Sequence, residues 1–413
     1  LRYIVMSYQA AGQAEEALDV ARLGLRFFPN YADLYYYSGL LYLELKRYAL
    51  ARESFQRAVS MPEQPAQYAS FGGVKGFRSY YHLGQIDEVF LNYEDAVRYY
   101  VLCLRDNPDF TPALENIVRI LKPRENPDYA KKCLEKVFEF STPRANQIMG
   151  DIYFRQGAYS LALEYFNRYT DSEPASPETQ LWKAICLIQL RRYLEALRII
   201  ESFNSGSHLY PLAMLNKLFC FWVQGKKQKV RSILAELRTL GLAEDTDKVL
   251  TLFLNAQDKR RNTTRVTLGR DGTDLLLDII KRLLDMNETD RVMYLLNKVS
   301  PESLAGHRLC VARLFYDFGY KEKAETLLRE YLTAKQDGEA HYLLAEICRE
   351  NGRYIEAGQH YRYAVELNPD EPRYYISQIS LYDNWRKRIL HEAIEKYPDI
   401  EVFIKYSEEA PVN

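Results

Sequence analysis

Small and large apolar residues recur along residues 32–62 with the spacing of two consecutive helices. Small side chains at Gly39, Ala51 and Ala58 would let two helices approach closely, and large side chains would fill the space around the crossing. Pro62 has no backbone N–H and cannot continue a helix, so it marks the end of the second one. The pattern therefore predicts a helix–turn–helix hairpin over 32–62. Its large positions are Tyr35, Tyr42, Tyr48 and Phe55.

This hairpin pattern recurs along the chain. Clear copies of one or both helices lie at 93–108, 149–174, 183–203 and 343–369, and weaker ones at 1–29, 111–142, 211–240, 273–300 and 305–335. Repetition of such a unit about every 34 residues is typical of tetratricopeptide repeats, and the chain resembles that family along nearly its whole length. We therefore expect an all-α fold, a right-handed superhelical solenoid of about ten helix–turn–helix repeats.

Two stretches interrupt the period. Pro62 and Pro108 are 46 residues apart, against 33 for Pro29 and Pro62, so about a dozen residues are inserted near 63–76. The second stretch is basic and has no strong period; its cations are Lys259, Arg260, Arg261, Arg265 and Arg270. It could contact an acidic partner or be simply solvated. We expect an N-terminal array over 1–240, an irregular helix and basic loop over 241–272, and a C-terminal array with capping helices over 273–413.

Composition narrows the function classes. Lys and Arg total 55 against 56 Asp and Glu, so no global basic field favours nucleic acid. The 34 tyrosines suit helix interfaces where one end of the ring is packed and the other is wet. The six cysteines form no CxxC pair, which favours reduced, mostly buried thiols and a cytoplasmic protein. No apolar run has the length of a membrane span.

The glycine-rich stretch 71–84, FGGVKGFRSYYHLG, invites comparison with a phosphate-binding loop. It lacks the GxxxxGK[ST] spacing, and no strand precedes it. Backbone N–H groups at the start of the next helix, beside Lys75 and Arg78, could still form an anion site. The alternative is a flexible connector.

Other chemical signals are weak. The acidic triplet 245–247 resembles a metal-binding triplet of sugar-nucleotide transferases, but it precedes a helix and is better explained as a cap in an acidic first turn, formed by Asp245 or Thr246. His341 and Cys348 could share a helix face, yet two ligands do not make a zinc site. We therefore expect no catalytic residue, no metal and no cofactor in this chain.

The inner face of the solenoid offers a candidate partner groove. The register of the repeats places on this face Tyr36, Leu40, Tyr81, Gln85, Leu181, Leu215, Phe219 and Tyr342. Lys and Asn, which hold a terminal carboxylate in chaperone-binding tetratricopeptide domains, are missing from these positions. The mostly aromatic and apolar surface suits a peptide segment or another domain. The alternative is that some of these side chains only seal one repeat against the next.

A narrower resemblance lies in the segment from Phe71 to Leu114. It is similar to the repeat tails of bacterial family 2 glycosyltransferases, in which a Gly-Val-Gly-like turn and a Tyr-Tyr-Asn-Leu-Gly-like helix start follow a longer connection. Here the turn is Gly73–Gly76 and the helix start is Tyr80–Gly84, with His82 in place of Asn and Asp87 where an aromatic is expected. The resemblance implies a catalytic domain upstream, outside this sequence, so no catalytic residue carries over.

These observations favour a non-catalytic scaffold for protein–protein interaction. The glycosyltransferase resemblance implies a repeat tail that recruits an acceptor protein or mediates self-association. A free-standing adaptor in regulation or complex assembly is the main alternative. The third possibility is an enzyme whose site is built on the glycine-rich loop and the basic segment. Titration of nucleotides into the chain would test it, because binding that Lys75→Ala abolishes would support such a site.

Overall fold

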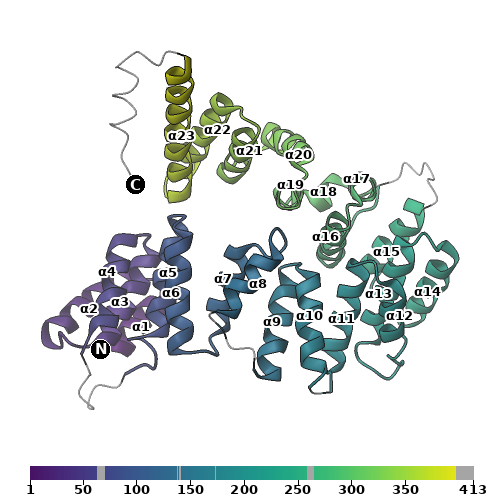
Figure 1. Cartoon of the computed structure of the whole chain (residues 1–413), viewed down its shortest axis with the longest axis horizontal. Helices are drawn as coiled ribbons and strands as arrows, with labels where there is room; N and C mark the ends of the chain where they lie inside the picture. Colours follow the sequence, from purple (N-terminus) through teal and green to yellow (C-terminus); the bar gives the residue numbers. More distant parts are fainter. Residues whose placement is uncertain (63–69, 137, 139–140, 173, 258–264, 397–413) are drawn as a thin grey trace. The chain divides into compact units, whose positions relative to one another are not determined.

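A computed structural model gives the fold of the chain (Figure 1). It describes all residues except 63–69, 137, 139–140, 173, 258–264 and 397–413, and omits the side chains of 256–257, 389–390 and 392–396. The described residues form 23 helices and one isolated parallel β-bridge, between Val266 and Val299. The all-helical repeat fold predicted from the sequence is confirmed.

Ten helical hairpins follow one another in the described chain. Seven come first: α1 (Arg2–Ala10) with α2 (Ala14–Phe27), α3 (Ala32–Glu44) with α4 (Tyr48–Ser60), α5 (Phe77–Val89) with α6 (Tyr93–Asp106), α7 (Thr111–Leu121) with α8 (Pro127–Glu135), α9 (Pro143–Arg155) with α10 (Tyr159–Thr170), α11 (Pro177–Gln189) with α12 (Tyr193–Ile200), and α13 (Tyr210–Val223) with α14 (Lys227–Thr239).

Three more hairpins and three single helices complete the order. The hairpins are α16 (Arg270–Asp285) with α17 (Thr289–Lys298), α19 (Arg308–Asp317) with α20 (Lys321–Ala334), and α21 (Gly338–Glu350) with α22 (Tyr354–Leu367). The single helices are α15 (Glu244–Gln257), the short α18 (Pro301–Leu304) and the long α23 (Pro372–Lys396). None of the described helices is both long and apolar enough to cross a lipid bilayer.

The chain divides into two compact units. One comprises residues 1–88 and 92–304, and the other comprises 89–91 and 305–413. The segment 241–272, for which we predicted an irregular helix and a basic loop, lies within the first unit and contains the regular helix α15. Lys259, Arg260 and Arg261 of the predicted basic loop lie outside the described residues.

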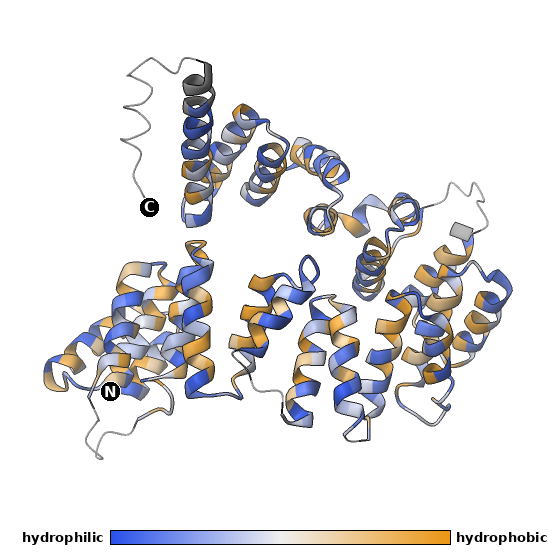
Figure 2. Ribbon diagram, viewed as in Figure 1, coloured by the Kyte–Doolittle hydropathy of each residue, from blue (hydrophilic) through white to orange (hydrophobic). Residues whose placement is uncertain are grey.

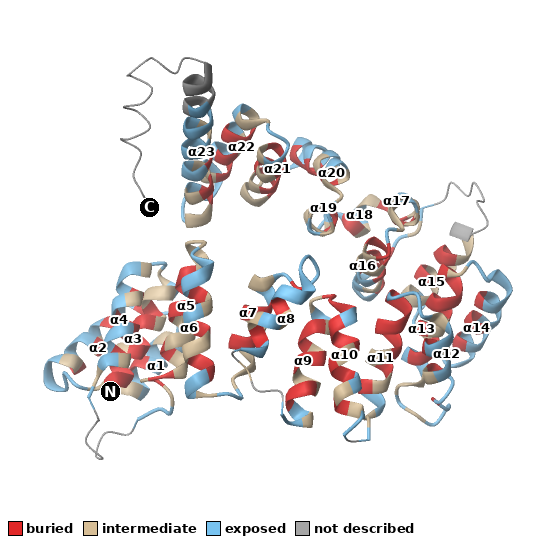
Figure 3. Cartoon of the chain, viewed as in Figure 1, coloured by how far each residue is buried: buried red, intermediate tan, exposed pale blue. Residues whose placement is uncertain are grey.

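The core of each hairpin is the crossing of its two helices. A Cβ added at Gly39 would lie 2.7 Å from the Phe55 ring, and one added at Gly150 would lie 2.5 Å from the Phe166 ring. Both aromatic rings are completely buried. Apolar residues fill the facing sides of paired helices, and these sides are the buried ones (Figures 2 and 3). The close approach predicted at Gly39, with Phe55 filling the crossing, is therefore confirmed.

Two carboxylates anchor the segment that interrupts the period. Asp33, which is completely buried on α3, accepts hydrogen bonds from the backbone N–H of Phe71 (2.8 Å) and from the hydroxyl of Ser70 (3.2 Å), and pairs with Arg2 at 2.9 Å. Asp106, at the end of α6, accepts from the backbone N–H of Phe77 at 2.7 Å. The described end of the insertion, residues 70–76, is thus fastened to the repeats on both sides.

A third carboxylate positions the start of α16. Asp245 Oδ2 accepts from the backbone N–H of Gly269 at 2.6 Å, and a Cβ on Gly269 would lie 2.4 Å from that same oxygen. The acidic first turn predicted at 245–247 is present, but α15 begins at Glu244, so Asp245 and Thr246 lie inside the helix and neither is its cap. The Asp245 carboxylate reaches Gly269, the residue before α16. Nearby, Val266 exchanges backbone hydrogen bonds with the segment after α17, donating to the Lys298 carbonyl and accepting from Ser300 N–H.

The α16–α17 hairpin also contacts repeats much earlier in the chain. The Gln189 amide donates to the carbonyl of Arg282 at 3.2 Å, and Arg191 donates to the carbonyl of Met286 at 2.8 Å. Arg124, in the α7–α8 connection, lies 3.4 Å from Asp285. These bonds join the α7–α8 and α11–α12 repeats to the C-terminal end of α16, so contacts within the first unit are not limited to neighbouring repeats.

Candidate interaction surfaces

The residues predicted to line the inner groove separate into two sets. Tyr36, Leu181 and Phe219 are at most 5% exposed and belong to the packed interior. Leu40, Tyr81, Gln85, Leu215 and Tyr342 are half-buried and keep some surface. The groove as a binding surface therefore stays a prediction that rests on this second set.

The burial of Tyr36 follows from its contacts with the next repeat. Its hydroxyl lies 3.2 Å from Nε2 of His82, whose Nδ1 lies 2.8 Å from Gln85 Oε1. Because a carbonyl oxygen only accepts, His82 donates from Nδ1 and its Nε2 accepts from Tyr36. His82 also stacks on Phe55, at 5.1 Å between ring centroids. His82, which stands where the sequence comparison expected asparagine, is thus a packing residue between α3 and α5.

Around Tyr81 the surface is aromatic on one side and charged on the other. The Tyr81 ring contacts Phe110, with centroids 5.2 Å apart in an edge-on arrangement. Two turns further along α5, Glu88 accepts from the Tyr100 hydroxyl and pairs with Arg119 of α7. The Glu88–Arg119 ion pair therefore links these two neighbouring repeats, a contact that the repeat register does not predict.

In the second unit, Tyr342 is largely occupied by its own neighbours. Its ring stacks on Tyr374 of α23 at 5.0 Å, and the Arg373 guanidinium lies 5.1 Å from the ring centroid. Its hydroxyl lies 3.4 Å from the Ser377 hydroxyl. A partner at this position would have to share Tyr342 with α23.

Lys75, in the loop, and Arg78, in the first turn of α5, both donate to backbone carbonyls. Lys75 Nζ donates to Pro62 (2.8 Å) and Arg78 Nε to Gly72 (2.9 Å). At the start of α5, where we predicted that an anion could bind, the Asp106 carboxylate already accepts the backbone N–H of Phe77. A Cβ at Gly76 would lie 2.1 Å from that carboxylate, which explains the glycine. An anion site at Lys75 and Arg78 stays a prediction, and its ligand would compete with Asp106.

A buried histidine pair joins α21 and α22. Nδ1 of His341 and Nδ1 of His360 are 3.0 Å apart, and Nε2 of His341 lies 2.9 Å from Gln336 Oε1. In the neutral pair His341 therefore donates to Gln336 and accepts from His360. Burial, and secondly the neighbouring His341, lower the pKa of His360 to about 4. Glu356 opposes this shift, while Arg329 and Arg353 add to it.

This pair should make the second unit sensitive to mild acid. Between pH 6.5 and 4 the unfolded chain binds a proton at His360 that the folded chain does not, so stability falls as the pH falls. We expect a loss of about 1 kcal/mol between pH 7 and 5.5, a window above most carboxylate pKa values. Urea unfolding at both pH values would show it. The loss should be smaller in His360→Phe, because His341, whose pKa burial also lowers, still takes up a proton on unfolding. It should persist unchanged in His208→Gln, whose side chain is 75% exposed. Equal losses in all three proteins would contradict it.

His341, which was considered with Cys348 as a metal ligand, has other partners. His341 faces His360 and Gln336, and no group of three or more His, Cys, Asp or Glu side chains among the described residues is placed to hold a metal ion.

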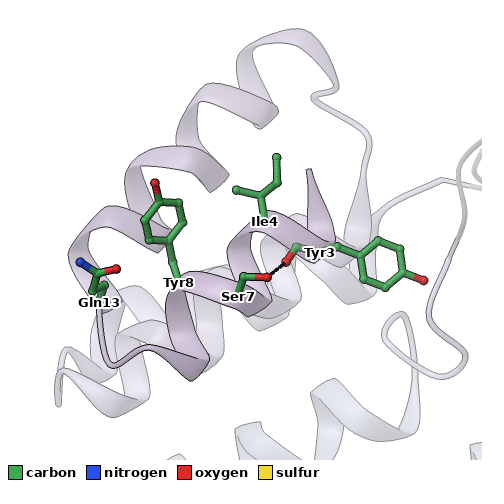
Figure 4. A pocket seen from close by; sticks show the side chains of 5 residues that line it. All are labelled: Tyr3, Ile4, Ser7, Tyr8 and Gln13. Carbon is green, nitrogen blue, oxygen red and sulfur yellow. Dashed lines mark hydrogen bonds between the residues drawn. The ribbon is translucent and has the colours of Figure 1, made fainter.

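The first helix carries an exposed apolar surface that the sequence analysis missed. We call Tyr3, Ile4 and Tyr8 the α1 face; these side chains are 70%, 49% and 36% exposed. Tyr3 and Ile4 are consecutive residues on the first turn of α1, and Tyr8 follows one turn after Ile4. With Ser7 and Gln13 they line an open pocket of about 410 Å³ (Figure 4). Only Val5 of this helix is buried. The signal was present in residues 1–8, LRYIVMSY, where apolar residues surround the helix instead of forming one stripe.

Comparison with known proteins agrees with the repeat architecture. Residues 4–68 and 312–372 match the tetratricopeptide repeat family, and 124–203 match subunit 3 of the anaphase-promoting complex, or cyclosome. None of the curated proteins matches the sequence significantly.

Among solved structures, the chain is similar to Naa15/Naa10 bound to HypK-THB, with 12% identity, a TM-score of 0.33, and 95% and 67% of the two chains covered. A tetratricopeptide repeat protein from Parabacteroides merdae gives 16% identity, a TM-score of 0.34, and coverage of 61% of this chain and 96% of that one. The tetratricopeptide domain of P58(IPK) gives 14% identity, a TM-score of 0.25, and coverage of 95% and 97%. With the fold described above, the family matches identify this chain as an α-helical solenoid that contains tetratricopeptide repeats.

Proposed function

We propose that this chain is a scaffold for protein–protein interaction and that the α1 face is a surface to which a partner binds. The observation that carries the proposal is the exposure of Tyr3, Ile4 and Tyr8 on a helix that is otherwise part of a packed array. Contiguous apolar surface on a folded protein typically marks an interaction site. Tyrosine is favoured there because its ring is large and rigid and its hydroxyl tolerates water.

The chemistry of the face favours an apolar helix as the occupant. Within the array, several later first helices are approached by the second helix of the preceding repeat, as α2 packs against α3 and α10 packs against α11. A helix is therefore the shape that this architecture uses to cover such a surface. An amphipathic helix would present its apolar stripe to Tyr3, Ile4 and Tyr8 and keep its polar side in water.

The test requires a purified partner. Proteins retained by the immobilised chain would be identified, produced separately and titrated by calorimetry. We expect Tyr3→Ser and Ile4→Ser each to weaken binding by about tenfold or more, as truncation of a central apolar anchor does. Phe27→Ser is the matched control, since Phe27 is 71% exposed but lies on α2. Equal affinity of all variants would exclude the α1 face, and concentration-dependent sedimentation abolished by Ile4→Ser would identify a second copy as the occupant.

The inner groove is a second candidate surface, supported by the half-buried Leu40, Tyr81 and Gln85 on adjacent repeats. Tyr81→Ala measured in the same calorimetric assay separates the two surfaces, because it leaves the α1 face intact.

The finer reading, a repeat tail of a bacterial glycosyltransferase-like protein in the cytoplasm, rests on the glycine-rich turn and helix start alone. The alternative is a free-standing adaptor. The coding sequence upstream of Leu1 distinguishes them. A sugar-transferase domain there supports the first, and a start codon within a few residues excludes it.

A further inference from the structure

Arg282, on α16, is an arginine whose guanidinium has no hydrogen-bond acceptor among the described residues. Its Nε and Nη2 atoms are buried and without a partner. The guanidinium carbon lies 3.9 Å from the centroid of the Phe219 ring on α13. Burial lowers the pKa of Arg282, and the charge that chiefly opposes this is that of Asp278, an exposed residue one turn earlier. Leaving buried donors of a charged group unpaired costs more than leaving neutral ones unpaired.

A second arginine with an unpaired donor packs against the same helix, α13. Arg291, on α17, is placed 4.7 Å from the centroid of Trp222, and its buried Nη1 has no partner among the described residues. Its other nitrogens are used: Nη2 donates to the Val223 carbonyl at 3.5 Å, and Nε lies 3.5 Å from Glu288. The rings of Phe219 and Trp222 are neighbours, with centroids 6.1 Å apart. Both guanidinium groups therefore cover adjacent rings of α13.

Asp285 and Glu288, two of the acids nearby, already pair with cations of this chain. Asp285 pairs with Arg124 at 3.4 Å and accepts from Gln189, while Glu288 lies 4.0 Å from Arg191 as well as near Arg291. The neighbouring arginines Arg124 and Arg191 thus have partners from this chain, and Arg282 does not. As whole residues Arg282 and Arg291 are half-buried, so other parts of each side chain reach the surface, and a ligand must displace the neighbours that cover the unpaired nitrogens.

We propose that Arg282 and Arg291 form a binding site for a carboxylate group, built on the aromatic wall of Phe219 and Trp222. Arg282 offers two unpaired N–H donors in a planar fork, the geometry that fits the two oxygens of a carboxylate. Nη1 of Arg291 supplies a further donor. The aromatic rings hold the guanidinium planes in place and exclude water from one side, which strengthens a charge-assisted bond. This site is separate from the α1 face and does not depend on the function proposed for it.

The test uses the whole chain with sodium acetate as the probe, at constant ionic strength maintained with sodium chloride. Acetate should raise the melting temperature saturably, by roughly 2 °C at a concentration tenfold above its Kd. The rise should disappear in Arg282→Gln. It should persist in Arg270→Gln, whose side chain on the same helix is 92% exposed, and in Lys75→Ala, which reports on the glycine-rich loop.

Each other outcome overturns the proposal. If acetate has no saturable effect on the wild-type chain, no such site exists, whatever the variants do. A response that survives in Arg282→Gln but is lost in Lys75→Ala moves the anion to the loop. A larger response to inorganic phosphate than to acetate, also lost in Arg282→Gln, replaces the carboxylate with a phosphate. Arg282→Gln removes an unpaired buried charge and should remain folded, which circular dichroism checks.

Discussion

Gly39→Leu is expected to destabilise the second repeat by about 3 kcal/mol, because the added side chain cannot fit against Phe55. Even a Cβ at this position would lie 2.7 Å from the ring, and the ring is completely buried and cannot swing away. A shift of this size corresponds to roughly a hundredfold loss of amide protection in α3 and α4, which hydrogen exchange with mass spectrometry would localise. Repeats far along the array should change little, since each repeat contacts chiefly its neighbours.

A double substitution separates this clash from other effects of losing a glycine. Alanine is a better helix former than glycine by about 1 kcal/mol. In the wild-type chain Gly39→Ala should still destabilise, but with Phe55→Leu present the ring is gone and Gly39→Ala should stabilise. Gly306→Leu is the control, because a Cβ there has no neighbour within 4 Å. If Gly39→Leu behaves like Gly306→Leu, the assigned crossing is wrong.

The second large effect is expected at Asp33. Asp33→Ala removes the partner of Arg2, whose side chain is only 12% exposed, together with the acceptor for Phe71 N–H and Ser70. Breaking a pair that is largely shielded from water should lower the free energy of unfolding by about 3 kcal/mol. The described end of the insertion should become a preferred site of limited proteolysis, since its anchor on α3 is lost.

An exposed ion pair of similar chemistry provides the comparison for Asp33. Asp19 pairs with Arg22, but their side chains are 76% and 51% exposed. Asp19→Ala should therefore change stability by less than about 0.5 kcal/mol and leave the cleavage pattern unchanged. Asp33→Asn should fall between the two, because it keeps an acceptor oxygen and loses the charge. Equal stability of Asp19→Ala and Asp33→Ala would show that the anchor contributes nothing.

The helix crossings could be predicted from the sequence because they are local. Gly39 meets Phe55, and Gly150 meets Phe166, 16 residues further along within one hairpin, so a single repeat period contains both partners. The anchors of the insertion could not be predicted in this way. Asp33 and Phe71 are 38 residues apart, and their contact depends on the path of an irregular segment that has no period.

The candidate surfaces, too, could be predicted from the sequence only in part. Counting from the repeat register places a residue on a helix face, but burial depends on what the next repeat brings to that face. Tyr36 is buried because His82 and Phe55 close over it, whereas Leu40, one turn later, is half-buried. Arg282 gives no signal in the sequence, since an arginine in an amphipathic helix ordinarily faces solvent. Its environment depends on the packing of α16 against α13, since Phe219 lies more than 60 residues before Arg282 in the sequence.

The contact between the C-terminal end of α16 and the α11–α12 repeat also affects how the first unit extends under a pulling force. The bonds from Gln189 to Arg282 and from Arg191 to Met286 close a loop of about a hundred residues that includes α12 to α15. While these bonds hold, a pulling force applied at the two ends of the unit passes across them and leaves the enclosed helices unloaded. When they break, roughly 300 Å of chain becomes available for extension. An array of hairpins without such bonds would extend one repeat at a time. In this unit the two hydrogen bonds must break before the repeats between them can extend.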